Sequence, residues 1–490
     1  MTINFKVSRS ASSTDAVGVV VPAEGPVPSA VGLSRRELTD RGFDGKVGQT
    51  MIMHGLGGSR VVIAVGIGDP RKFGPTEART AAAALARAAG KAGTLSTSLP
   101  EAGRGNRAEI TQAVVEGIRL ATHRYVDLKN DKSGASKLSA VTFTVSAANA
   151  AAVTSGVARG TTVADAVCLA RDLANTPPAY LTARMMADRA VEIAKATDLE
   201  VTVYDKDQLA NMGCGGLLGV NKGSTEPPRM VKLVYTPKSA AKKIKGKVAH
   251  VVLVGKGVMY DSGGISLKPS DGFHVVMKMD MSGAAAVLAT MSTLAALKCK
   301  VKVTAFLMCT DNMPSGSALK LGDVLTMRNG KTVEIHNTDA EGRLILADGL
   351  SLAAESKPNA IIDIATLTGA CLVALGEKVA GVLGNNDALV AQMREASSRV
   401  DEPIWQLPLV PDYRKLLDST VADMRNIGGP SGGTITAALF LKEFVNDTPW
   451  AHLDIAGPMK VDGDEGWMQK GATAFGTRLL IDTVCNFRAL

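Results

Sequence analysis

The sequence predicts an α/β protein of two domains, a small N-terminal α/β domain and a larger C-terminal domain built on a mixed, mostly parallel sheet. At 490 residues the chain exceeds the size at which one hydrophobic core keeps growing. Short β-branched segments alternate with alanine-rich segments of helical periodicity. Hydrophobic residues make up 46% and charged residues 21%, which is typical of a globular enzyme and excludes a disordered or fibrous chain.

The first part of the chain has the alternation expected of a small α/β domain. The predicted strands are residues 16–21, 60–66 and 140–145, and the predicted helices are residues 77–92 and 108–124. Glycines between positions 55 and 68 complete neither a GxGxxG nor a GxxxxGK[ST] pattern, so we interpret them as tight turns.

A double proline marks the junction between the domains. The helix predicted at 162–173 is followed by Asn175, Thr176, Pro177 and Pro178. It must end in this segment, because proline cannot continue a helix and favours an extended residue before it. We therefore place the N-terminal domain at residues 1–160 and the C-terminal domain at residues 161–490.

Strands and helices alternate again after the junction, which predicts a mostly parallel sheet covered on both faces. The predicted strands are residues 201–204, 231–235, 248–254, 302–308 and 360–364. The predicted helices are residues 185–196, 284–297 and 344–356.

Charge and cysteine content limit the classes of partner and compartment. The net charge of +8 comes from 55 basic and 47 acidic residues, and its main basic run, 238–247, fits a solvated loop better than a nucleic-acid site. The six cysteines form no CxxC pair, as expected in a reducing compartment. The N-terminus lacks an apolar signal core, and charged residues interrupt the apolar stretch 360–384. We expect a cytoplasmic protein without a membrane span.

Charged side chains follow the strand 248–254, where ligands of open α/β sheets are bound. The segment GKGVMYDSGG carries Lys256 and Asp261, and Lys268 follows it. Asp280 precedes an alanine-rich helix, so it is either a site residue or the N-cap of that helix.

A third acidic segment, HNTDAEGRL, leads into the helix 344–356. The spacing of Asp339 and Glu341 puts both carboxylates on one side of an extended loop, where they could share a metal ion. Arg343 lies at the positive end of the helix, so we expect a bound anion there.

Three aspartates and one glutamate in one cleft would repel one another unless cations neutralise them. Two divalent ions would do so, and a lysine could join as a neutral amine. The donor set is mostly oxygen without histidine or cysteine, which favours Mn²⁺, Mg²⁺ or Zn²⁺.

With these segments in place, the sequence resembles the leucyl aminopeptidase family of cytosolic di-metal peptidases. The segments VGKGVMYDSGGISLKPS and NTDAEGRL match its two signatures, and ARDLANTPPAYLT, DIATLTGAC and HLDIAGPM match it further. The resemblance covers the C-terminal part, whereas the first 150 or so residues match only in general pattern. It implies a three-layer α/β/α zinc-peptidase-like catalytic domain.

The resemblance also implies the roles of the site residues. The metal ligands would be Lys256, Asp261, Asp280, Asp339 and Glu341, with Asp261 and Glu341 touching both ions, zinc or manganese. Lys268 would polarise the scissile carbonyl, and Arg343 would hold a bicarbonate acting as general base. The pocket for the first side chain of the substrate would be lined by Met277, Thr366, Gly369, Ala456 and Met459. One departure is the stretch PSDGFHVVMKM before Asp280, which is one residue longer than usual in the family.

The function implied is hydrolysis of leucine and other mainly apolar residues from peptide N-termini, in intracellular peptide turnover, by a homohexamer. Three alternatives stay open: a DNA-binding or regulatory protein, which the basic charge allows but does not favour, a catalytically silent scaffold, and a dipeptidase that prefers cysteinyl-glycine. Histidines 336 and 452 are interpreted as structural groups.

Overall fold

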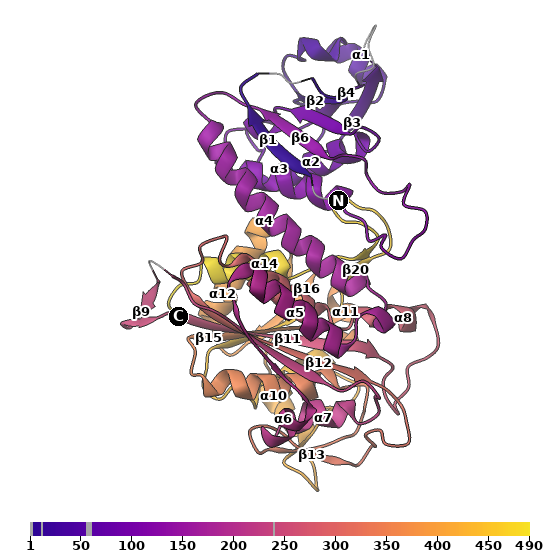
Figure 1. Ribbon diagram of the computed structural model, residues 1–490, viewed down its shortest axis with the longest axis vertical. Helices are drawn as coiled ribbons and strands as arrows, with labels where there is room; N and C mark the ends of the chain where they lie inside the picture. The colour runs from indigo at the N-terminus through magenta and orange to yellow at the C-terminus, as the bar shows by residue number, and fades with distance from the viewer. Residues whose placement is uncertain (1–2, 11–12, 55–60, 239–240) are drawn as a thin grey trace. The chain divides into compact units, whose positions relative to one another are not determined.

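The computed structural model describes residues 3–10, 13–54, 61–238 and 241–490. Contacts divide the chain into two compact units, Met1–Cys168 with Val461–Lys470, and Leu169–Lys460 with Gly471–Leu490. The return of residues 461–470 to the first unit was not predicted from the sequence. Both units combine helices with mixed sheets, which confirms the predicted fold class (Figure 1).

The first unit contains a six-stranded sheet in the order β1-β6-β5-β2-β4-β3, parallel except at the β3–β4 pair. Its strands are β1 (Asn4–Ser8), β2 (Ala16–Val21), β3 (Thr50–His54), β4 (Val61–Gly66), β5 (Thr94–Thr97) and β6 (Ala140–Thr144). Helices α2 (Pro75–Ala88) and α3 (Arg107–Thr122) bury their alanine and valine faces in its core. The three strands and two helices predicted there are present, although residues 55–60 of the glycine-rich segment 55–68 lie outside the described residues.

The predicted start of the helix at residue 162 is wrong. Helix α4 runs without a break from Ala150 to Asn175. Gly156 and Gly160 weaken its sequence signal, but an added Cβ there would lie 2.4 Å from Ala108 O and 2.8 Å from Gln112 O. These glycines allow α4 to pack closely on α3, and this tertiary packing outweighs their low helix propensity.

The second unit is built on an eight-stranded sheet in the order β17-β16-β19-β15-β11-β12-β8-β7. Its central strands are β11 (His250–Asp261), β12 (Lys302–Asn312), β15 (Ala360–Ala365) and β19 (Trp450–Asp454), all paired in parallel. The outer strands are β7 (Glu200–Tyr204), β8 (Arg229–Tyr235), β16 (Ala380–Gly384) and β17 (Ile404–Gln406). Burial on both faces explains why the central strands are continuous apolar runs.

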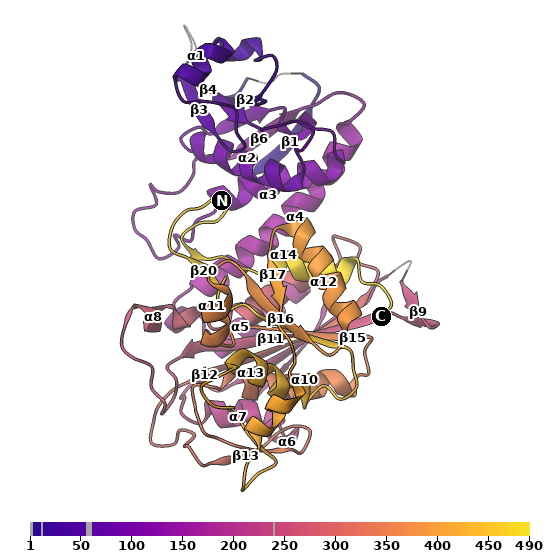
Figure 2. The same cartoon turned by 180° about the vertical axis from the view of Figure 1, so that it is seen from behind.

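Helices cover both faces of this sheet and make three layers, as Figures 1 and 2 show. One face carries α5 (Ala183–Thr197), α9 (Ser282–Thr293), α12 (Asp387–Val400) and α14 (Thr477–Cys485). The other carries α7 (Gly215–Asn221), α10 (Gly342–Glu355) and α13 (Gly433–Lys442). The main core of the unit lies between α10 and the sheet, so α10 is fixed beside the ends of the central strands.

Candidate metal centre and substrate cavity

Lys256 and Asp261 both lie on strand β11, which continues well beyond the predicted end at residue 254. They are an odd number of residues apart, so a regular strand would place them on opposite faces. The register with β12 shifts between Val258 and Asp261, and such an irregularity reverses the alternation beyond it. Both side chains consequently line one cavity.

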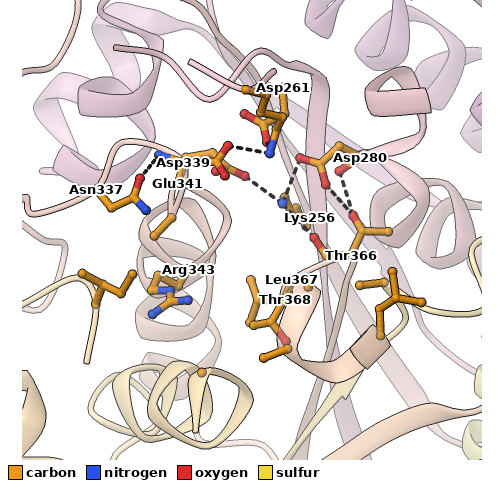
Figure 3. Close-up of a pocket in the computed structure, with 18 of the residues that line it drawn as sticks. Lys256, Asp261, Asp280, Asn337, Asp339, Glu341, Arg343, Thr366, Leu367 and Thr368 are labelled. Atoms are coloured by element: carbon orange, nitrogen blue, oxygen red, sulfur yellow. Dashed lines mark hydrogen bonds and ion pairs between the residues drawn. The ribbon is translucent and has the colours of Figure 1, made fainter. Parts of the chain in front are cut away.

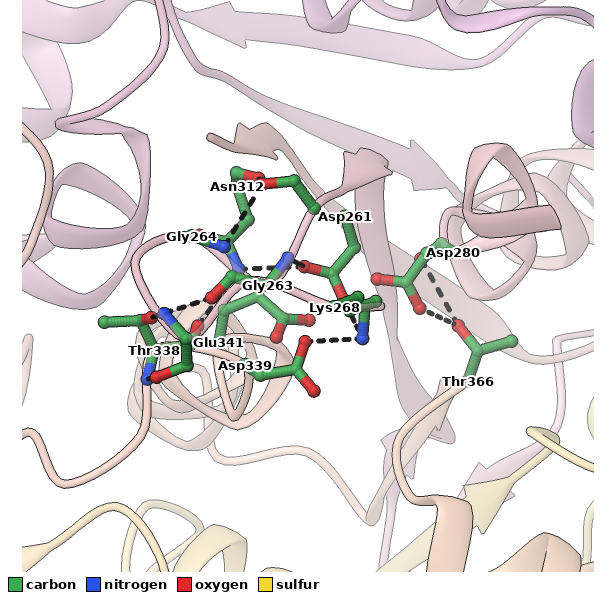
Figure 4. Close-up of polar contacts among 12 residues, drawn as sticks. Asp261, Gly263, Gly264, Lys268, Asp280, Asn312, Thr338, Asp339, Glu341 and Thr366 are labelled. Atoms are coloured by element: carbon green, nitrogen blue, oxygen red, sulfur yellow. Dashed lines mark hydrogen bonds and ion pairs between the residues drawn. The ribbon is translucent and has the colours of Figure 1, made fainter. Parts of the chain in front are cut away.

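The turn after β11 holds the carboxylate of Asp261 in place. Gly263 has a φ of 87°, and a Cβ there would lie 2.4 Å from Ser266 O, so glycine is required. Asp261 Oδ1 accepts from Gly263 N at 2.9 Å and from Asn312 Nδ2 at 2.8 Å. Figure 4 shows that Asp261 Oδ2 is left facing Lys268 and the other acids.

Two lysines each bridge two of the acids. Lys256 Nζ lies 2.8 Å from Asp280 Oδ2 and 2.7 Å from Glu341 Oε1, and it donates to Thr366 O at 2.9 Å (Figure 3). Lys268 Nζ lies 2.8 Å from Asp261 Oδ2 and 2.5 Å from Asp339 Oδ1. The structure thus brings together all five predicted metal ligands and the predicted catalytic lysine.

Asp280 is not the N-cap of the alanine-rich helix α9, so that alternative is wrong. Helix α9 has Met281 at its N-cap position, without a side-chain cap. The Asp280 carboxylate instead accepts from Thr366 Oγ1 at 2.7 Å and contacts Lys256. It therefore belongs to the acidic cluster.

Buried carboxylates dominate the electrostatics of this cluster. Burial raises the pKa of Asp280, Asp339 and Glu341, and the neighbouring Asp261 charge adds to the effect at each. Burial alone would lower the pKa of Lys256, but the charges of Asp280 and Glu341 outweigh it and raise that pKa. The cluster is stable only when positive charge balances it.

The oxygen atoms suit a hard divalent cation. Ligand oxygens of Asp261, Asp280 and Glu341 lie within 4.8 Å of one another, and all three residues are buried. Apart from its ion pair with a lysine, neither Asp280 Oδ2 nor Glu341 Oε1 has a hydrogen bond to any described residue. Oxygens at this spacing that contact only a lysine fit two cations bound by carboxylates and the Lys256 amine.

Arg343 lies in the first turn of α10, and its guanidinium lines the same cavity. Its Nη1 donates to Asn426 O at 2.8 Å, but its Nε has no hydrogen-bond partner among the described residues. Burial lowers the pKa of Arg343 to about 10, against the opposing charges of Glu341 and Asp454. A buried, charged donor at a helix N-terminus suits an anion.

The cavity has a volume of about 240 Å³. The acidic cluster forms one part of its wall, and the predicted first-side-chain pocket forms another: Met277, Thr366, Gly369, Ala456 and Met459. Phe273, in the longer loop before Asp280, also lines it. The cavity therefore places apolar surface next to the acidic cluster.

Asp454 is a buried residue that the sequence analysis missed. It ends strand β19, and its Oδ1 accepts from Leu367 N at 3.2 Å, Thr368 N at 3.4 Å and Ala456 N at 3.2 Å. Its Oδ2 accepts from Thr368 Oγ1 at 2.6 Å. An acid at the carboxyl end of an apolar strand, within HLDIAGPM, was the available signal.

Comparison with known proteins identifies the family. Residues 168–481 match the model described as "Cytosol aminopeptidase family, catalytic domain", and residues 29–132 match the N-terminal domain of the same family. The chain belongs to the cytosol aminopeptidase family. It is therefore a peptidase that acts on peptide N-termini, which confirms the family and enzyme class predicted from sequence. The cytosol aminopeptidase family consists of di-metal enzymes.

Its relatives match over nearly their whole lengths. Probable cytosol aminopeptidases of Gloeobacter violaceus and Pseudomonas aeruginosa are each 41% identical, covering 88% and 97% of this chain and 87% and 93% of their own. The bottromycin maturation enzyme BotP in complex with Mn has a TM-score of 0.87 at 38% identity, covering 96% of this chain and 99% of BotP. Among the described residues of the chain, no helix has both the length and the apolar character needed to cross a membrane.

Proposed function

We propose that this chain removes N-terminal leucine and other mainly apolar residues from peptides, with two divalent cations in the acidic cluster. The observation that carries the proposal is the group of three buried carboxylates, within 4.8 Å of one another, in the wall of a partly apolar cavity. The proposed ligands are Lys256, Asp261, Asp280, Asp339 and Glu341. The complex of BotP with Mn supports manganese as one candidate, and zinc is the other.

When bound, the two cations would supply Lewis acidity for the free amine and the scissile carbonyl of the substrate, and would activate water. Lys268, held between Asp261 and Asp339, would place its ammonium where negative charge develops on the carbonyl oxygen. Arg343 would hold a bicarbonate as proton acceptor, because its buried Nε has no hydrogen-bond partner among the described residues. The apolar wall with Met277 and Met459 would receive the first side chain.

Peptide turnover in the cytoplasm and assembly as a homohexamer belong to the same proposal. The family name carried by the relatives supports the first. Light scattering would test the second, and a monomer at working concentration would contradict it.

The test is hydrolysis of leucine p-nitroanilide by metal-stripped protein, before and after Mn²⁺ or Zn²⁺ is added. We expect metal-dependent cleavage, and none of an N-acetylated leucine control. Lys268→Ala should lower kcat by about 10²- to 10³-fold, as loss of one oxyanion donor does, with little change in bound metal. Absence of cleavage with either metal would refute the proposed function.

A further inference from the structure

Cys299 lies against the last turn of α14, where Cys485 is found, on one face of the eight-stranded sheet. Cys299 lies in the turn between α9 and β12 and is only 3% exposed. Its Sγ lies 3.9 Å from Val484 O, in the last turn of α14. Cys485 is the next residue and is half-buried. The fold thus brings Cys299 against the end of a helix that is distant in sequence.

A cavity gives solvent a route to Cys299. Its volume is about 310 Å³, and its wall includes Cys299, Tyr235, Lys238 and Lys298. Tyr235 Oη donates to Cys299 O at 2.8 Å and fixes the backbone of the turn. Lys238 is ion-paired with Asp198, which also lines this cavity. Cys299 is therefore buried yet open to a small oxidant.

The chemistry of Cys299 differs from that of other buried cysteines. A hydrogen bond from the Cys485 thiol lowers the pKa of Cys299, despite burial. In contrast, burial raises the pKa of Cys214, Cys309 and Cys371 to about 12. Because the thiolate is the nucleophile, oxidation should select Cys299 over those three.

We propose that Cys299 and Cys485 form an oxidation site, at which hydrogen peroxide entering the cavity converts the two thiols into a reversible disulfide. The Cys299 thiolate attacks one peroxide oxygen, the O–O bond breaks, and the leaving hydroxide takes up a proton to become water. The Cys485 sulfur then attacks the sulfenic sulfur, and a second water leaves with the proton of the Cys485 thiol. One peroxide is reduced, two sulfurs are oxidised, and a dithiol reductant reverses the change.

The disulfide would join the end of α14 to the turn that precedes β12. Neither cysteine lines the cavity of the acidic cluster, so the site is separate from the proposed metal centre. The cross-link closes a long loop, which restricts the unfolded chain and should stabilise the folded one. We therefore expect oxidation to raise thermal stability.

The experiment treats reduced, folded full-length protein with hydrogen peroxide, blocks remaining thiols with N-ethylmaleimide and maps tryptic peptides by mass spectrometry. The expected product joins peptide 479–488 to the dipeptide 299–300 with a deficit of two hydrogens, and dithiothreitol removes the link. Two results with the wild-type chain would overturn the proposal. One is maleimide on both Cys299 and Cys485, and the other is Cys299 sulfinic acid without a disulfide to Cys485.

Matched variants test the thermal effect. Peroxide should raise the thermal midpoint of the wild type and of Cys168→Ser, a buried cysteine outside the pair, and leave that of Cys485→Ser unchanged. An equal rise in Cys485→Ser would show that another reaction is responsible and would contradict the proposed stabilisation.

Discussion

Replacing Asp454 by alanine tests how the cavity is held in shape. Its carboxylate accepts hydrogen bonds from the backbone N–H groups of Leu367, Thr368 and Ala456 and from the hydroxyl of Thr368. The same loop holds Thr366, whose hydroxyl donates to Asp280 and whose carbonyl accepts from Lys256. Asp454→Ala should therefore loosen both the cavity wall and the acidic cluster.

The magnitude follows from the number of donors lost. Asp454 is fully buried, and each hydrogen bond to a charged group contributes about 1.5–3 kcal/mol. Four such bonds share one carboxylate and are not additive, and burying the carboxylate offsets part of their sum. We therefore expect a loss of about 3–5 kcal/mol, comparable to breaking a buried ion pair.

The assay combines urea unfolding with steady-state kinetics at saturating Mn²⁺. Asp454→Ala should unfold at lower urea and show reduced kcat/KM, whereas Asp454→Asn retains one acceptor oxygen and should fall between it and the wild type. Urea midpoints and kinetics equal to those of the wild type in Asp454→Ala would refute the reasoning that this carboxylate organises the loop.

Three further predictions concern charge and burial elsewhere. Lys256→Met should destabilise the metal-free protein by about 3 kcal/mol, because two acids then face each other uncompensated. Mn²⁺ should raise the thermal midpoint of the variant only in part, because one proposed ligand is missing. Glu116→Ala removes the partner of buried Arg79, at 2.9 Å, and should cost about 3–5 kcal/mol in urea unfolding, against less for Glu116→Gln. Burial lowers the pKa of His250 from 6.5 to about 4. Between these two pH values, the unfolded chain therefore binds a proton on His250 that the folded chain does not bind. Unfolding free energy should therefore fall as pH drops through that window, and His250→Gln should reduce the slope.

The sequence determined the kinds of elements and most of the chemistry-bearing residues. Alternation of β-branched and alanine-rich segments depends on local periodicity, so the α/β class and most strands and helices could be predicted. The glycines around Lys256 and the acids before α10 stand in short contiguous segments, and these segments carried the resemblance to the aminopeptidase family. Residues within one such segment can be recognised without knowing what they contact.

Element boundaries could not be read in the same way. Strand β11 extends to Asp261 because β12 pairs with it as far as that residue, although glycine and lysine interrupt its apolar run. Helix α4 continues through Gly156 and Gly160 because α3 packs against them. In both cases a neighbour distant in sequence outweighs local propensity.

Only the tertiary structure decided which side chains meet. The irregularity in β11 that brings Lys256 and Asp261 to one cavity, the contact of Asp280 with Thr366, and the approach of Cys299 to α14 all depend on chain crossings. Asp454 gave little signal because most of its hydrogen-bond donors belong to Leu367 and Thr368, almost ninety residues earlier. Residue type and periodicity are local properties of the sequence, whereas a site assembled from several strand ends exists only once the sheet has formed.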